Sequence, residues 1–291
     1  MEYEVERLRR VMVIRNYSPK TIQVYTSAVG SWLGQLGKPV FLVRPADIQK
    51  WQYGLVNEQQ ISWCRFNQMT CAVRFYLRYV RNIKWSVSSI PFQRKRRRLP
   101  SILTRQEVSR LLSSSLRNLK HHAILATLYS TGLRLGELLN LQMKDIDTAR
   151  MLVHVRHGKG GSDRQVQLCP QLLTTLMRYS AECGSGSSAW LFGGKIKGCK
   201  MHPSAIQHMV CVYSKLASIG KRISPHTLRH CFATHLLEDR TDLRTIQALL
   251  GHRNIQATEV YLHIASHHIQ AIRNPLTNLF RLIDTAVFGG A

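Results

Sequence analysis

A run of five basic residues between two prolines divides this chain. The run, residues 94–98, lies in the stretch Pro91–Pro100 (PFQRKRRRLP). Like charges at neighbouring positions repel one another, and a proline disfavours helix at the residue before it. The stretch therefore predicts an exposed, extended linker over residues 92–100. We expect the 291 residues to form two domains, residues 1–91 before the linker and residues 101–291 after it.

The first domain has the pattern of a small helical bundle. Ser18 and Pro19 form a typical helix start, and apolar residues then recur at helical spacing until Gly37. Similar patterns predict helices over 45–56 and 62–81, the second with an apolar stripe on one side and four arginines elsewhere. Such a bundle suits the surface of DNA, but a basic face that is only solvated fits the pattern equally well.

The second domain is predicted to be mostly helical with one β-hairpin. A capping box, Thr104–Glu107, starts a helix. Further helices are expected over residues 123–130, 170–180 and 202–219. Residues 153–157 and 164–168 alternate apolar and polar side chains on either side of a glycine-rich turn and so predict two paired strands. The fold class is therefore mainly α with a small β-hairpin or sheet in the second domain.

The charge of the chain favours a polyanionic partner. The sequence has 41 Lys and Arg against 16 Asp and Glu, a formal net charge of +25, and the excess is spread along the chain. Self-repulsion of this size disfavours a compact fold, and phosphate groups relieve it. No long apolar run and no signal-peptide pattern is present, so we expect a cytoplasmic protein that does not bind a membrane.

The residues best suited to chemistry lie in the stretch 224–263. His226 and Arg229 stand three apart in one predicted helix, so their side chains project from the same face. A second imidazole, His252, follows a glycine that ends another predicted helix, and Tyr261 comes nine residues later. Guanidinium and imidazole suit a phosphate that gains negative charge in a transition state, and a tyrosine hydroxyl can be the nucleophile.

Together these pieces resemble the catalytic core of the tyrosine recombinases, the phage-integrase family, and within it the Xer and integron-integrase branch. The matching motifs are His226-Thr-Leu-Arg229-His230, Ala233-Thr-His-Leu-Leu, Leu250-Gly-His252, Tyr261 and, nearer the N-terminus, Thr-Gly-Leu-Arg134-Leu-Gly-Glu137-Leu. The resemblance implies a two-domain architecture, a helical core-binding domain followed by an α+β catalytic domain. The added segment of integron integrases has no counterpart here, so ordinary duplex sites are the expected substrate.

The resemblance implies a role for each residue of the catalytic motif. Tyr261 attacks a scissile phosphodiester, forms a 3′-phosphotyrosine and frees a 5′-hydroxyl. Arg134, Arg229 and His252 hold the nonbridging oxygens, and His226 assists deprotonation of Tyr261. Because a phenol has a pKa of about 10, we expect the surrounding cations to lower the cost of deprotonating it. The reaction requires no metal, cofactor or ATP.

Other segments receive roles from the same resemblance. Lys159, on the hairpin turn, protonates the leaving oxygen, although an exposed turn lysine fits the sequence as well. Glu137 supports Arg134, and His230 supports the neighbouring site groups. The candidate DNA-binding residues of the linker are Arg94, Lys95, Arg96, Arg97 and Arg98. Residues 266–281 keep helical periodicity, which suits either docking onto a neighbouring protomer or packing within the chain.

The predicted function is site-specific recombination of paired sites in double-stranded DNA by a homo-oligomer, a tetramer on DNA, at the bacterial nucleoid. Integration, excision, transposition and dimer resolution all fit. Two alternatives remain open. A catalytically inactive DNA-binding accessory protein would have the same charge and domains, and a type IB topoisomerase-like enzyme would share the chemistry. Exchange of strands between two duplexes separates a recombinase from a topoisomerase.

The cysteines do not predict a metal site. The seven cysteines are scattered, which fits reduced thiols in a cytosolic protein. Cys199, His202, His208 and Cys211 have two x-x spacings of the kind that zinc ligands use. The five residues between the two halves are, however, fewer than the usual zinc-finger spacer.

Overall fold

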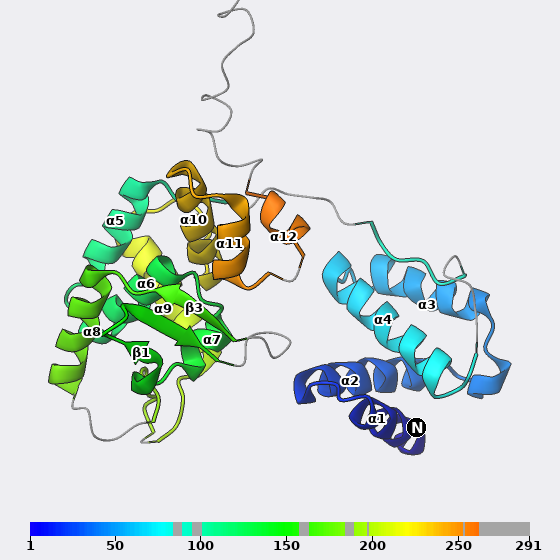
Figure 1. The fold of residues 1–291 in the computed structure, drawn as a ribbon. Coiled ribbons are helices and arrows are strands. Elements are labelled where there is room, and N and C mark those ends of the chain that lie inside the picture. Colours follow the sequence, from blue (N-terminus) through cyan, green and yellow to red (C-terminus); the bar gives the residue numbers. More distant parts are fainter. Residues whose placement is uncertain are drawn as a thin grey trace, which may run out of the picture. The chain divides into compact units, whose positions relative to one another are not determined.

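The computed structural model describes residues 1–83, 89–94, 101–156, 163–183, 189–196, 198–252 and 254–261. The chain folds into two compact units, Met1–Arg97 and Arg98–Ala291 (Figure 1). Each unit has its own hydrophobic core. Lys159, the linker residues Lys95–Arg98 and the predicted tail helix 266–281 lie outside the described residues, whereas Arg94 is described and exposed.

The first unit is a small bundle of α-helices. Its elements are α1 (Glu2–Ile14), α2 (Pro19–Gln35), the short 3-10 helix η1 (Val40–Leu42), α3 (Pro45–Asn57) and α4 (Trp63–Tyr79). The buried rings of Trp32 and Tyr76 lie 6.0 Å apart and join α2 to α4. The three predicted helices are confirmed, and Ser18 caps α2 by accepting a hydrogen bond from the backbone N–H of Thr21 at 3.2 Å.

Helix α1 was not predicted from the sequence. Its N-cap is Met1, which makes no side-chain capping hydrogen bond, so the start of the helix carries no sequence signal. Contacts with the rest of the bundle hold it in place. The hydroxyl of Tyr76 donates to Glu4 at 2.6 Å, and Arg81 donates to the same carboxylate at 3.2 Å.

The second unit surrounds the apolar helix α6 (Leu119–Thr131) with further helices and one small sheet. The other helices are α5 (Arg105–Ser114), α7 (Leu135–Asn140), η3 (Met143–Asp145), α8 (Pro170–Cys183), α9 (Pro203–Leu216), α10 (Pro225–Glu238), α11 (Leu243–Leu250) and α12 (Gln256–Glu259). The predicted capping box is present, since Thr104 accepts from the N–H of Glu107 and Glu107 accepts from the N–H of Thr104.

The sheet has three antiparallel strands in the order β1 (Ile146–Asp147), β2 (Leu152–Val155) and β3 (Arg164–Gln167). The predicted hairpin is confirmed as β2 and β3, with Val155 opposite Arg164 at the end nearest the turn. Strand β1 is only two residues long and carries no alternation from which it could be predicted. The molecule is therefore mostly helical with a small sheet, as expected.

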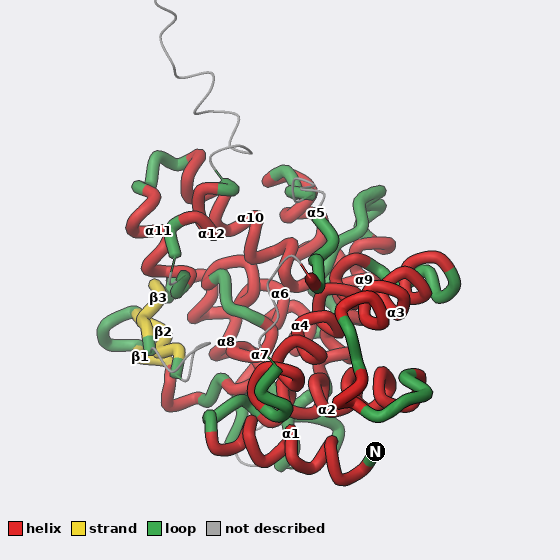
Figure 2. The backbone as a smooth tube through the Cα atoms, turned by 90° about the vertical axis from the view of Figure 1, so that its right-hand side faces the viewer, coloured by secondary structure: helices red, strands yellow, loops and turns green. Residues whose placement is uncertain are grey.

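The end of α6, the start of α7, the end of α11 and strand β3 lie close together in the second unit. Helix α11 packs against α10, α12 and β3, and α10 packs against α6, as the ribbon and the tube both show (Figures 1 and 2).

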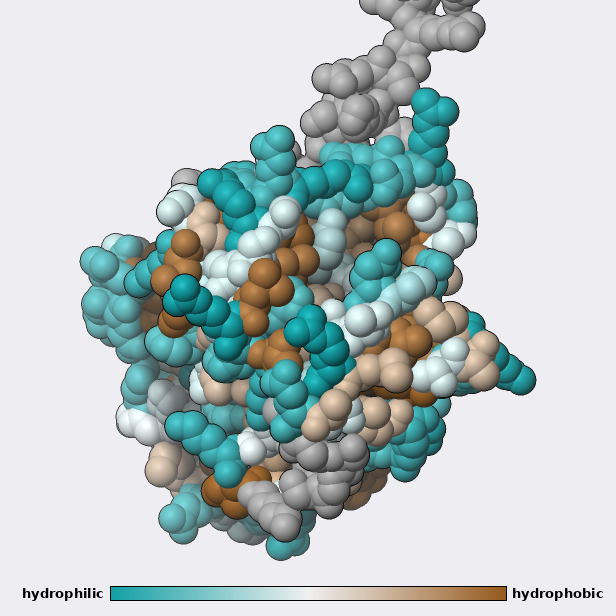
Figure 3. Space-filling view, turned by 90° about the vertical axis from the view of Figure 1, so that its left-hand side faces the viewer, coloured by the Kyte–Doolittle hydropathy of each residue, from teal (hydrophilic) through white to brown (hydrophobic). Residues whose placement is uncertain are grey.

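Hydrophilic side chains dominate the face drawn in Figure 3, where hydrophobic ones form separate patches. Every helix within the described residues is too short or too polar to cross a membrane.

Candidate active site

The first arginine motif forms the start of α7. Arg134 is the N-cap, and its backbone N–H donates to Oε2 of Glu137 at 2.8 Å. Its guanidinium donates through Nη1 to Oε1 of Glu137 at 2.7 Å and through Nη2 to the carbonyl of Gly251 at 3.0 Å. The predicted pair of Arg134 and Glu137 is thus formed, and it is also joined to the end of α11.

A further arginine, Arg164, completes the surroundings of Glu137. Its Nη1 and Nη2 donate to the two carboxylate oxygens at 3.0 and 2.7 Å. Burial raises the pKa of the Glu137 carboxyl, but the hydrogen bonds from Arg164 and Arg134 outweigh burial and bring the pKa to about 2. Glu137 is therefore an anion at neutral pH although it is only 7% exposed. The sequence pattern alone does not identify Arg164 as a site residue.

Arg229 projects from α10 into the same region and is 1% exposed. It donates through Nη1 to the carbonyl of Gly132 and through Nη2 to the carbonyl of Leu250, both at 2.6 Å. Its Nη1 lies 3.9 Å from Oε2 of Glu137. Burial, followed by the charge of Arg134, lowers the pKa of Arg229 to about 10, so the group stays charged at neutral pH.

Three guanidinium groups therefore surround one carboxylate, which leaves an excess of positive charge in a largely buried cluster. Each guanidinium donates to carbonyl or carboxylate oxygens of the chain. Donors that are fixed in this way lose little entropy when an anion binds, and the low local dielectric strengthens their attraction for it. The cluster is suited to hold a phosphate.

His252 lies beside Arg229 because α11 ends at Gly251. Gly251 has φ 61°, a left-handed conformation that glycine adopts without steric cost. The Nε2 of His252 is 3.1 Å from Nη2 of Arg229, and its Nδ1 is 2.9 Å from the hydroxyl of Thr258. Burial and the charges of Arg229 and Arg134 lower the pKa of His252 to about 4. The ring is therefore neutral at pH 7, with Nε2 accepting from Arg229 and Nδ1–H donating to Thr258.

Tyr261 is buried next to this cluster with 1% of its surface exposed. Its ring packs among apolar side chains of α10 and α11, which include Leu237 and Leu250. Burial raises the pKa of the Tyr261 phenol, while the charges of Arg229 and Arg134 act in the opposite direction without offsetting burial. The expected lowering by neighbouring cations is thus present but is smaller than the effect of burial.

The imidazole at the Tyr261 hydroxyl belongs to His230. Its Nδ1 is 3.0 Å from the hydroxyl oxygen, whereas the ring of His226 packs against the ring of His230 at 5.0 Å between centroids. His226 makes no hydrogen bond within the described part of the chain and is exposed. Burial, then His226 and Arg229, lower the pKa of His230 to about 4, so this ring is also neutral at pH 7.

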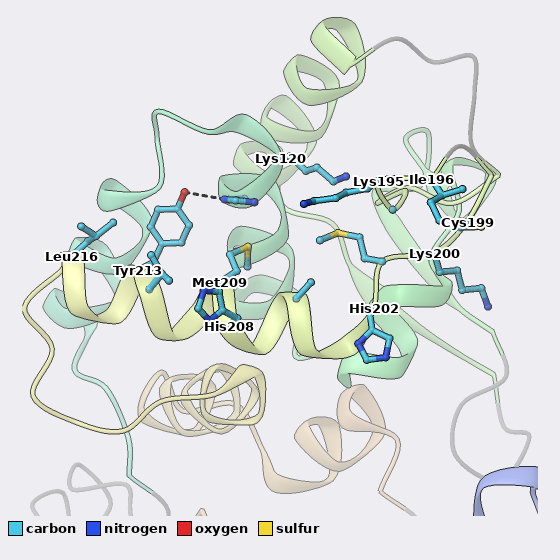
Figure 4. Close-up of a pocket in the computed structure, with 15 residues that line it drawn as sticks. Lys120, Lys195, Ile196, Cys199, Lys200, His202, His208, Met209, Tyr213 and Leu216 are labelled. Carbon is cyan, nitrogen blue, oxygen red and sulfur yellow. Dashed lines mark hydrogen bonds between the residues drawn. The ribbon is translucent and has the colours of Figure 1, made fainter.

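A cavity of about 620 Å³ lies elsewhere in this unit, between α6, α9 and the segment 194–202 (Figure 4). None of the clustered residues lines it. Cys199, His202 and His208 lie apart in its wall, and the described residues contain no group of three or more His, Cys, Asp or Glu side chains that could hold a metal ion.

Comparisons with known proteins identify a family. Residues 101–268 match the phage integrase family, and residues 5–87 match the N-terminal SAM-like domain of phage integrases. A candidate integrase/recombinase of Sinorhizobium fredii is 37% identical over 96% of this chain and 90% of its own length. The tyrosine recombinase XerA of Thermococcus kodakarensis is 34% identical over 91% of this chain and 92% of its own length.

Solved structures have the same fold. A crystal structure of XerA recombinase is 27% identical, with a TM-score of 0.57 over 94% of this chain and 99% of that chain. The XerH recombinase in a post-cleavage complex with its difH substrate is 20% identical, with a TM-score of 0.72 over 92% of this chain and 83% of that chain. The chain belongs to the phage integrase family, the tyrosine recombinases.

Proposed function

We propose that this protein is a site-specific recombinase that cuts and rejoins duplex DNA through a 3′-phosphotyrosine on Tyr261. The observation that carries the proposal is the cluster in which Arg134, Arg229 and His252 meet beside the buried Tyr261. Its excess positive charge fits a phosphodiester. The XerH structure, a post-cleavage complex with a DNA site, supports the same substrate class for a relative of this fold.

In the proposed cleavage step, the Tyr261 oxygen forms a bond to phosphorus and the bond from phosphorus to the 5′-oxygen breaks. Arg134 holds a nonbridging oxygen, whose negative charge grows in the transition state. Arg229 is as deeply buried as Tyr261, so it holds the other oxygen once the movement of Tyr261 uncovers its guanidinium. The proton of the phenol passes to an imidazole, and Lys159 gives a proton to the leaving 5′-oxygen. Rejoining is the reverse reaction with the 5′-hydroxyl of a partner strand, so no external energy source is needed.

The imidazole that takes the phenol proton is proposed to be His230. His230 is neutral and within hydrogen-bond distance of the hydroxyl, so it can take the phenol proton as Tyr261 leaves the apolar cluster. The negative charge of a bound phosphate would raise the low pKa of His230 and make it a stronger base. His226, which the sequence analysis assigned to this task, is proposed to contact the phosphate from the exposed side. His252 can hold a nonbridging oxygen only after its Nε2 gains a proton, which a bound phosphate would favour.

Burial of Tyr261 means that attack on DNA requires a movement. A ring that is 1% exposed has no access to a phosphodiester. Tyr261 lies two residues after the end of the short helix α12, which packs against α11. We propose that DNA binding releases Tyr261 from the apolar cluster and brings its hydroxyl to the phosphate held by the arginines.

Both domains and the linker are proposed to take part in DNA binding. Residues 1–91 and 101–291 are proposed to bind DNA as two domains, with the basic linker 92–100 following the backbone between them. We propose that a homotetramer recombines paired sites, since the solved relatives include a lambda integrase tetramer bound to a Holliday junction. The proposed substrate places this work at the nucleoid, in the cytoplasm.

The substitution Tyr261→Phe tests the nucleophile. Wild type should form a denaturant-resistant protein–DNA adduct in the presence of a chelator, on a nicked site from which the freed end diffuses away. Tyr261→Phe deletes one oxygen and should form no adduct while keeping DNA binding. Tyr213→Phe is the matched control, because Tyr213 also bonds a histidine Nδ1 at 3.0 Å with ring centroids 5.6 Å apart. It should form the adduct normally.

An adduct formed by the Tyr261→Phe variant would show that another group is the nucleophile. Absence of an adduct in wild type, on a site to which it demonstrably binds, would instead favour a DNA-binding accessory protein. Footprinting on the DNA that flanks the gene supplies the site for the assay.

A further inference from the structure

We propose that Arg164 is a positioning residue of the phosphate site, which couples the β-hairpin to Glu137 and to the end of α11. The inference rests on the proposed function, because its purpose is to orient Arg134 and His252 beside the phosphate. Arg164 itself is not proposed to touch DNA, since only 9% of its side chain is exposed.

The guanidinium of Arg164 donates hydrogen bonds to two helices, α7 and α11. Its Nη1 and Nη2 form a fork on the two oxygens of Glu137, and its Nε donates to the carbonyl of Leu249 at 2.7 Å. A planar guanidinium presents these donors in a fixed geometry that a lysine ammonium does not reproduce. One side chain on β3 therefore fixes both α7 and the last turn of α11.

The carboxylate of Glu137 depends on this fork. Four hydrogen bonds reach its oxygens in the structure, two from Arg134 and two from Arg164. Arg229 lies at 3.9 Å, which is beyond hydrogen-bond distance. Removal of Arg164 would leave a buried carboxylate with half of its partners, and burial would then favour its neutral form. A neutral Glu137 would hold the guanidinium of Arg134 less firmly.

The contact with α11 extends the effect to His252. The carbonyl of Leu249 lies one turn before His252, and the intervening Gly251 accepts from Arg134. A Cβ on Gly251 would lie 3.1 Å from Cδ of Arg164, so the backbone of the site packs directly on the Arg164 side chain. Arg164 thus supports the residues on both sides of the proposed phosphate position.

The position of Arg164 along the chain links it to Lys159. Arg164 is the first residue of β3 and pairs with Val155, the last residue of β2. The connection between these two residues carries Lys159. Fixing Arg164 to α7 and α11 therefore fixes the base of that connection relative to the arginine cluster.

Arg164→Met and Arg164→Lys test the inference, with Arg178→Met, an exposed arginine on α8, as the matched control. Full-length protein is assayed for the rate of adduct formation on a saturating nicked site. A misplaced catalytic group typically costs about a hundredfold in rate. We expect a decrease of that order for Arg164→Met, a smaller decrease for Arg164→Lys and none for Arg178→Met, with DNA affinity unchanged in all three.

The pH profile distinguishes positioning from a general loss of structure. In wild type, Glu137 faces Arg134 on its own element, Arg164 on β3 and Arg229 on α10, and stays ionised. In Arg164→Met it should gain a proton at higher pH than in wild type, so the rate should show an additional fall on acidification that wild type lacks. The double variant Arg164→Met/Glu137→Gln should lack this additional fall.

Three outcomes would overturn the inference. The first is that Arg164→Met cleaves as fast as Arg178→Met. The second is that Arg164→Met cleaves slowly but with the pH profile of wild type. The third is that the double variant Arg164→Met/Glu137→Gln still shows the additional fall in rate. A wild type that forms no adduct overturns the proposed function itself, and the positioning role with it. If wild type forms the adduct and Arg164→Met forms it at the same rate, this inference alone is overturned.

Discussion

At the scale of single residues, protonation decides what the site can do before DNA arrives. The imidazoles of His230 and His252 are neutral at pH 7, and the positive charge comes from Arg134, Arg164 and Arg229. Two neutral rings next to several guanidinium groups avoid further repulsion in a buried cluster. A bound phosphate reverses this balance, because its negative charge favours protonated imidazole.

The same two histidines predict how stability depends on pH. Each has a pKa of about 4 in the folded protein, against about 6.5 in an unfolded chain. The unfolded state therefore binds protons that the folded state excludes. Their contribution to folding is complete above pH of about 6.5 and is lost as the pH falls towards about 4.

Thermal unfolding measured across this pH range without DNA should show this decrease in stability. The variant His230→Gln, which keeps a polar partner for Tyr261, should lose less stability on acidification than wild type. His208→Gln, an exposed histidine of α9, is the control and should behave as wild type does. An identical acid response of His230→Gln and wild type would contradict the assignment of His230 as a buried neutral ring.

The sequence named Arg134, Glu137, Arg229, His252 and Tyr261, and the structure places them in one region. It could not find Arg164, because an arginine at the start of a strand has no local pattern. Its partner Glu137 is 27 residues away. Nor could spacing decide between the two histidines of α10. Which ring reaches Tyr261 depends on how the segment after α12 packs against α10.

At the scale of elements, the site depends on how three helices end or begin. Arg134 caps α7, Gly251 ends α11, and Gly132 ends α6 with φ 59°. The carbonyl of Gly132 holds Arg229. The sequence predicts a helix where a side chain caps its start, as Ser18 does in α2 and Thr104 does in α5. It does not predict β1 or α1, which are fixed mainly by tertiary contacts.

Gly132→Ala should damage both stability and cleavage. An added Cβ would lie 2.4 Å from Cδ1 of Phe232, and φ is positive. A left-handed non-glycine residue costs roughly 1–2 kcal/mol, and displacement of the ring adds to this cost. The shift should also misplace the carbonyl that holds Arg229. Denaturant unfolding and the adduct assay measure the two effects.

Gly136→Ala is the matched control for this prediction. Nothing lies within 4 Å of a Cβ at Gly136, which is inside α7. Alanine is favoured over glycine in a helix by about 0.5–1 kcal/mol, so this variant should be as stable as wild type or more so. Equal stability of the two variants would show that the close approach of Phe232 is not maintained in solution.

At the scale of the whole molecule, both units carry excess positive charge. Met1–Arg97 has 17 Lys and Arg against 5 Asp and Glu, and Arg98–Ala291 has 24 against 11. The excess does not come from one domain or from the linker alone. This distribution of charge therefore favours DNA binding by both domains over binding by one domain or by the linker alone.

The dependence of DNA affinity on salt concentration tests whether these charges bind phosphate groups. Each neutralised phosphate releases counterions and contributes about 0.9 to the slope of log affinity against log salt. If the protein neutralises about six to ten phosphates, affinity should fall about 10³- to 10⁵-fold between 50 and 200 mM salt. Fluorescence anisotropy with a labelled duplex measures the slope. A flat titration of wild type would rule out extensive binding to phosphates.

The linker's share of that slope can be measured separately. Replacing the five basic residues 94–98 by glutamine should reduce the slope by up to about 0.9 for each phosphate that the linker neutralises in wild type. Replacing Arg9 and Arg10, which pair with Glu6 in α1, is the control. This control should reduce the slope less per charge removed, because Glu6 already compensates one of the two charges. An unchanged slope for the linker variant would show that residues 94–98 do not follow the DNA backbone.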